Sequence, residues 1–132
     1  MTPQELRDRS QRFALDIIAF CDSLPRDPRT QEIANQLHDA ANSAAMNYRA
    51  TCRGRSPKEF IAKICITVEE ADETVGWLET LLKSRKVVGA EPNRLLAEAT
   101  ELLKIFAASK RTAIRNYEMR EAAAKRGRAA SR

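Results

Sequence analysis

Apolar residues recur between positions 57 and 87 at alternating spacings of four and three residues. They are Ile64, Val68, Ala71, Val75, Leu78 and Leu82. This heptad pattern predicts a helix that lies nearly parallel or antiparallel to its neighbours. Ser56, Pro57 and Glu59 suit an N-cap, a first helical residue and a capping-box carboxylate. We therefore expect a helix from Pro57 to about Val87.

Three further segments have the apolar periodicity of helices. The first is expected from about Pro3 to Leu24, the second from an N-cap near Thr30 to about Cys52, and the last from Pro92 onward. Pro25 and Pro28 break the chain after the first segment, because each disfavours helix in the residue before it. The inner face of the second segment is poor in large side chains, so its neighbour should approach closely. That face reads Ile33, Leu37, Ala40, Ala41, Ala44 and Tyr48.

Short connections make successive helices antiparallel neighbours, so the predicted fold is all-α, an antiparallel up-down-up-down four-helix bundle. We assign residues 1–118 to the bundle and residues 119–132 to a basic, partly frayed C-terminal extension. We favour fraying beyond about Lys125, with a continued exposed helix as the alternative. Gly54 is expected as a left-handed residue near the end of the second helix, and Gly89 as the stop of the third.

One stripe of the heptad helix faces away from the predicted seam. Its members are Ile66, Glu70, Glu73 and Trp77. Because an exposed indole is costly on a monomer and Trp is favoured at interface centres, we expect this stripe to be a subunit interface. The alternative is that a bulge or a change of register turns Trp77 inward.

Charge is distributed unevenly along the chain, whose net charge is +5. Residues 49–63 hold five basic side chains and one acidic one, as do residues 119–132, so each stretch carries +4. Residues 69–79 hold five acidic side chains and no basic one, a charge of −5. Such regions can steer a ligand or pair subunits. Solvated helix faces are an equally good reading, since charge blocks are common on helical surfaces.

Composition excludes several classes of protein. No run approaches about 18 apolar residues, and the charged N-terminal segment does not resemble a secretory signal peptide. The three cysteines, Cys21, Cys52 and Cys65, are widely spaced without a CxxC motif. Reduced thiols in a cytoplasmic protein, with Cys52 and Cys65 as small apolar filler, are the simplest account.

Catalytic, cofactor and metal sites are not expected. A carboxylate-bridged two-metal bundle needs Glu-x-x-His pairs, whereas the chain has one histidine, His38, and no such pair. A single histidine also supports a Ser-His or Cys-His catalytic set poorly.

The corner between the second and third predicted helices is a candidate for binding RNA or DNA. Its candidate residues are Arg49, Arg53, Arg55 and Lys58. Contacts to phosphates need only such charge, and the basic C-terminal tail can add to it. The corner lacks an aromatic residue for base stacking apart from Tyr48, which the pattern also places in the core. In the alternative reading, the same arginines pair with Glu70 and Glu73 of a neighbouring subunit.

Residues 33–82 resemble a bacterial four-helix-bundle family first noticed as proteins encoded by intervening sequences in large-subunit ribosomal RNA genes. The resemblance rests on the spacing of Gln36, Ala40, Ala41, Ser43 and Asn47, on Arg55-Ser56-x-Lys58-Glu59-Phe60-Ile61, and on Leu78-Glu79-Thr80-x-Leu82. The family commonly has Ala-Glu-Gly-x-Gly-Arg after the helical Asn, whereas this chain has Arg-Ala-Thr-Cys-Arg-Gly at residues 49–54.

The resemblance implies a homo-oligomer of bundles, typically a pentamer, without a known enzymatic activity. A related branch, the accessory protein of diversity-generating retroelements, is a basic pentamer that binds a reverse transcriptase and nucleic acid. We therefore expect a non-enzymatic, self-assembling interaction or scaffold protein of the cytoplasm, whose partner is itself. The alternative is a nucleic-acid-binding accessory protein that uses the basic corner and the tail.

Overall fold

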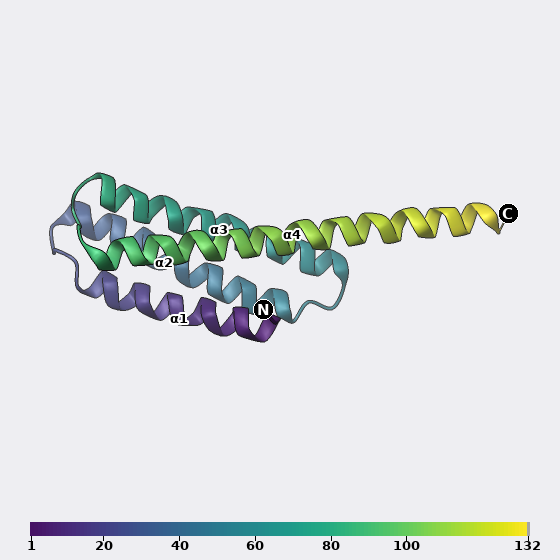
Figure 1. Cartoon of the computed structure of the whole chain (residues 1–132), viewed down its shortest axis with the longest axis horizontal. Coiled ribbons are helices and arrows are strands. Elements are labelled where there is room, and N and C mark those ends of the chain that lie inside the picture. The colour runs from purple at the N-terminus through teal and green to yellow at the C-terminus, as the bar shows by residue number, and fades with distance from the viewer. Residues whose placement is uncertain (132) are drawn as a thin grey trace.

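Four antiparallel helices form the molecule in the computed structural model, which describes residues 1–131. They are α1 (Pro3–Asp22), α2 (Pro28–Cys52), α3 (Pro57–Lys83) and α4 (Ala90–Ala130). Each helix packs on the next, and α4 also packs on α1, which closes the bundle (Figure 1). The predicted all-α four-helix bundle is confirmed.

The N-termini of α1, α2 and α3 follow capping rules. Thr2 and Glu5 form a capping box at α1, and Ser56 caps α3 by accepting a hydrogen bond from the Glu59 backbone N–H at 3.1 Å. At α2 the cap is Asp27, which accepts the Thr30 N–H at 3.0 Å. Our assignment of Thr30 as the cap was wrong, because Pro28 already suits the first helical position and Thr30 is buried in the first turn.

The end of α3 and the start of α4 also differ from the expectation. Helix α3 stops at Lys83, four residues early, because Arg85 adopts a left-handed conformation with φ of 60°. Gly89 lies directly before α4 with φ of 112°, which favours glycine there. Gly54 is not left-handed. A Cβ atom there would lie 3.2 Å from the Thr51 carbonyl oxygen, a tight contact that glycine avoids.

The buried face of α3 is rotated from the predicted seam. Four seam residues are buried, but Val68 and Leu82 are only half-buried. The most deeply buried positions include Thr67, Thr74 and Leu81. Both threonine hydroxyls donate to the carbonyl four residues earlier, at 3.0 and 2.8 Å, so they enter the core without an unpaired polar group.

Small side chains on α2 face the core, as predicted. Ala40, Ala41 and Ala44 are buried beside Leu37 and Tyr48, while Ile33 is half-buried. Small residues leave room for close approach, and α2 packs on both α1 and α3. The Tyr48 ring packs on Phe106 of α4, with ring centroids 5.1 Å apart.

Helix α4 continues well beyond the bundle. Residues 118–131 are all exposed, and the helix persists to Ala130 rather than fraying beyond about Lys125 (Figure 1). We refer to residues 118–131 as the extension. None of the described helices is both long and apolar enough to span a membrane.

Candidate nucleic-acid interface

Three of the four predicted phosphate-binding residues surround one hollow on the surface. Arg49 lies in the last turn of α2, Arg53 is its C-cap residue, and Arg55 follows in the loop before α3. Their hollow, which we call the corner hollow, has a volume of about 440 Å³. Its lining is Met46, Arg49, Ala50, Arg53, Arg55, Glu59 and Lys63. Four cationic side chains therefore share a concave surface with one carboxylate.

A second, smaller hollow continues the basic surface toward α1. It has a volume of about 190 Å³ and shares Met46, Arg49 and Arg53 with the corner hollow. Arg7 and Asp8 of α1 line its other side. Met46, which is 64% exposed, lies between the two hollows. An apolar side chain with arginines on both sides is a surface that can contact both the sugar and the phosphate of a polynucleotide.

The cations of the corner hollow differ from those of another hollow of equal volume, because they have no ion-pair partner within residues 1–131. Within residues 1–131 none of its four basic side chains forms an ion pair. A hollow of the same volume, about 440 Å³, lies between α1 and α4, but it is lined by three basic and three acidic residues. There Arg9 binds Glu98 at 2.6 Å, and Arg94 lies 3.4 Å from Asp16. Positive charge is thus neutralised at the α1–α4 hollow and left available at the corner.

Two residues considered for this site lie elsewhere. Lys58 is exposed on the first turn of α3 but does not line the corner hollow. Tyr48 is only 3% exposed, so its ring cannot stack on a base. Burial also raises the pKa of its hydroxyl above the usual value. Met46 and Arg7 were not predicted members of this surface, and Lys63 was counted only in the basic stretch of residues 49–63. The packing of α1, α2 and α3 places Met46 in both hollows, Lys63 in the first and Arg7 in the second.

The predicted interface stripe on α3 divides into two halves. Ile66, at 43% exposure, and Glu73 point outward, whereas Glu70 and Trp77 are half-buried, with Trp77 packed against the core. The rotation of α3 explains this. At about 100° per residue, Glu70 and Trp77 lie about 80–100° from the centre of the buried face, and the other two about 120–140° away.

The position of this stripe has one consequence for hydrogen bonding and one for a pKa. The Trp77 indole N–H donates to Glu73 Oε1 at 3.2 Å. Partial burial, with the neighbouring Glu73 and Glu69, raises the pKa of the Glu70 carboxyl. The stripe therefore offers less free apolar surface than its sequence suggests.

The remaining reactive side chains do not gather. Cys52 is exposed at the end of α2 rather than serving as filler, and Cys65 is half-buried. Burial raises the pKa of the Cys21 thiol to about 11. His38 lies on the surface with Nδ1 3.1 Å from Asp39 Oδ1. Across residues 1–131 no three His, Cys, Asp or Glu side chains are placed to hold a metal ion.

The bundle and its sequence were compared with known proteins. Residues 4–108 match the 23S rRNA-intervening sequence protein family. The chain belongs to this family. The resemblance inferred from residues 33–82 is thus confirmed, and the basic corner lies within the matched part of this intervening-sequence protein. The extension lies outside it.

Structural comparison supports the same fold. A crystal structure from the S23 ribosomal protein family of Bacteroides thetaiotaomicron, described as a protein with unknown function, is similar with a TM-score of 0.76 and 24% sequence identity. The match covers 84% of this intervening-sequence protein and 99% of the other chain. No curated protein matches the sequence.

Proposed function

We propose that the protein binds RNA or DNA through phosphate contacts at the corner hollow and acts without catalysis in the cytoplasm. The observation that carries this proposal is the set of unpaired cations at Arg49, Arg53, Arg55 and Lys63, which come from α2, the following loop and α3. At the α1–α4 hollow of equal volume, by contrast, Arg9 and Arg94 have acidic partners at short distance. A concave cluster of four cations and one carboxylate, with no ion pair among them, is suited to a polyanion.

The affinity should be independent of sequence and sensitive to salt. Each phosphate that a protein neutralises releases counterions, so the logarithm of the binding constant falls with the logarithm of salt concentration. The slope is about −0.9 per contact on duplex DNA and about −0.7 on single strands. Three arginines at one hollow therefore account for about two to three units of slope.

Fluorescence anisotropy with labelled oligonucleotides at rising salt tests this proposal. We expect binding near about 50 mM salt and a slope that falls by about two to three units in the triple variant Arg49→Gln, Arg53→Gln, Arg55→Gln. The matched control removes three charges from the opposite end of the bundle, through Arg26→Gln, Arg29→Gln and Lys83→Gln. Absence of wild-type binding near that salt concentration, or an equal loss in both triple variants, would contradict the proposal.

Self-assembly is a second candidate function, which the outer face of α3 favours. Ile66 is exposed there beside an acidic surface, and the basic corner offers a complementary surface on a different part of the molecule. Complementary surfaces on different faces give head-to-tail contacts, which close into rings when the rotation permits. A pentamer is the form that we propose, because the resemblance implies it.

Light scattering separates assembly from a monomer of 14.8 kDa. We expect a mass about five times larger, reduced by Ile66→Glu, because a carboxylate would be buried in the contact. Leu15→Glu on α1 is the control, since Leu15 is 58% exposed on another helix. A monomer at high concentration, or a mass unchanged in Ile66→Glu, would overturn this use of the α3 face.

A further inference from the structure

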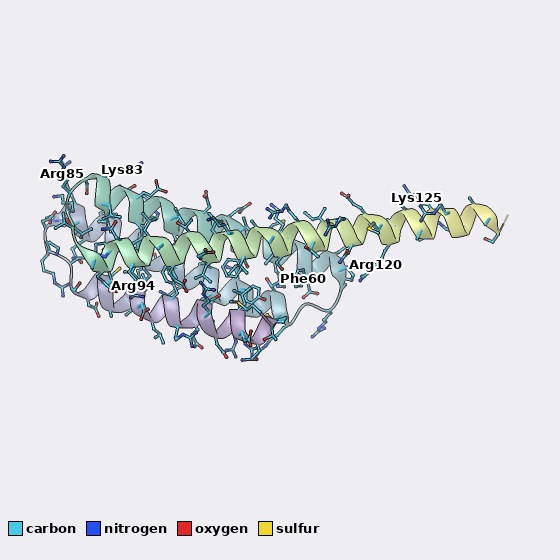
Figure 2. All side chains as sticks on the ribbon, viewed as in Figure 1. Phe60, Lys83, Arg85, Arg94, Arg120 and Lys125 are labelled. Atoms are coloured by element: carbon cyan, nitrogen blue, oxygen red, sulfur yellow. The ribbon has the colours of Figure 1, made fainter. Side chains whose placement is uncertain are left out.

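A further hollow lies where the α2–α3 loop faces the outer part of α4. Its volume is about 380 Å³, and its lining includes Arg55, Ser56, Phe60, Ala113, Asn116 and Arg120. We call it the extension hollow. Arg55 also lines the corner hollow, so the two hollows adjoin. Figure 2 shows Phe60 and Arg120 toward the end of the bundle from which α4 projects, with Lys83 and Arg85 at the opposite end.

Phe60 is held firmly at the edge of this hollow. Ser56 caps α3 one turn earlier, and the loop approaches so closely that a Cβ atom at Gly54 would lie 3.4 Å from the Phe60 backbone nitrogen. Phe60 is half-buried, packing against the hydrophobic core while also lining the hollow. Its side chain therefore lies between the core and the hollow, with part of its surface exposed.

The side chains around the ring have groups that suit a nucleotide. Arg55 and Arg120 come from opposite sides of the hollow and form no ion pair within residues 1–131. The Asn116 side chain supplies an amide, which can both donate and accept hydrogen bonds. An aromatic ring suits a base, and guanidinium groups suit the adjoining phosphates.

We propose that the extension hollow binds one unstacked base of single-stranded nucleic acid on Phe60, with the neighbouring phosphates on Arg55 and Arg120. The inference rests on the proposed phosphate binding at the corner and adds a preference that charge alone does not give. A base within a duplex is stacked on its neighbours and cannot reach a ring in a hollow, whereas a single strand can present it. The corner hollow then carries the continuing backbone.

Anisotropy with a single strand and with a duplex of the same sequence tests the site. Phe60→Leu keeps an apolar side chain but removes the ring, so single-strand affinity should fall at least about five-fold while duplex affinity changes less than about two-fold. Phe60→Trp keeps a stacking face and should retain single-strand affinity. Arg120→Gln should weaken both ligands and lower the salt slope by about one unit. Lys83→Gln at the far end should change neither.

The outcomes separate this inference from the proposed function. Wild-type protein that binds neither ligand near about 50 mM salt contradicts both. Wild-type binding with equal loss of single-strand and duplex affinity in Phe60→Leu, or with no loss, overturns the stacking site alone. A change of oligomeric mass in Arg120→Gln without a change in nucleic-acid affinity shows that the hollow contacts a second copy of the chain, which also overturns it. Thermal melting of the Phe60→Leu protein checks that it is folded.

Discussion

The Asp27 carboxylate links the N-terminus of α2 to the α3–α4 loop. Its Oδ1 accepts the Thr30 backbone N–H at 3.0 Å, and its Oδ2 accepts the Thr30 hydroxyl at 2.7 Å. The Lys86 ammonium, from the α3–α4 loop, lies 3.4 Å from Oδ1. The hydrogen bonds from Thr30, supported by Lys86, lower the pKa of Asp27 to about 2. The ionised form is thus favoured by folding.

This lowered pKa predicts how stability depends on acidity. A group with a depressed folded pKa stabilises the protein above its unfolded pKa of about 3.9, and this stabilisation is lost as the pH falls toward the folded value. We expect Asp27→Ala to lower the melting temperature at pH 7, with the difference from wild type shrinking between about pH 4 and pH 2. Asp39→Ala, at an exposed carboxylate inside α2, should have little effect at either pH. A difference that is constant across this range would contradict the role of the ionised cap.

For the helices, hydrophobic periodicity predicts which helices exist and in what order. It predicts less well which face of each helix is buried. The heptad of α3 identified Ile64, Ala71, Val75 and Leu78 as buried, and they are. It missed Thr67 and Thr74, because threonine counts as polar in a hydrophobicity pattern. Inside a helix its hydroxyl can bond to the carbonyl four residues earlier, so it enters a core at little cost. Because the two threonines were counted as polar, the predicted centre of the buried face lay farther from Trp77 than the observed one.

The residue at which a helix begins or ends was predictable only where a local sequence motif, such as a capping pair, sets it. The Asp27-Pro28 pair is a cap followed by a residue suited to the first turn, and the signal for α2 was present although Thr30 was chosen. The early end of α3 has no such signal. Arg85 is left-handed, and a non-glycine residue in that region is uncommon enough that sequence alone does not suggest it.

The candidate site was predictable to the extent that it is local in sequence. Arg49, Arg53 and Arg55 are close neighbours along the chain, so a count of charge finds them. Phe60 was read as part of a family motif, but its position facing Arg120 depends on how α3 lies against α4, 60 residues apart in sequence. Side chains from distant helices meet only after the bundle has formed.

The whole molecule has a chemical polarity along its axis. The α2–α3 loop and the departure of α4 lie at one end, together with the start of α1 (Figure 1). The corner hollow, the extension hollow and the extension are therefore parts of one basic end. A polyanion bound at the corner would meet the extension next, since Arg55 lines both hollows.

Removing the extension tests this arrangement. Within residues 118–131, a chain that ends at Tyr117 loses only exposed side chains, so its melting temperature should remain close to that of the full chain. It also loses four basic residues against two acidic ones within residues 118–131, so nucleic-acid affinity and salt slope should both fall. The comparison variant keeps the helix and replaces all five basic residues beyond Tyr117, Arg120, Lys125, Arg126, Arg128 and Arg132, with Gln, which has good helix propensity.

The two variants should behave alike if charge is what the extension contributes. The extension rises about 20 Å beyond Tyr117, at about 1.5 Å per residue, and residues 118–131 are all exposed. Its helicity then serves to carry cations outward in a fixed line from the corner. A truncated chain that melts at a clearly lower temperature, or dissociates in light scattering while the glutamine variant does not, would instead assign the extension to contacts between copies. In that case nucleic-acid affinity should follow the corner arginines alone, because the extension would lie buried in the assembly.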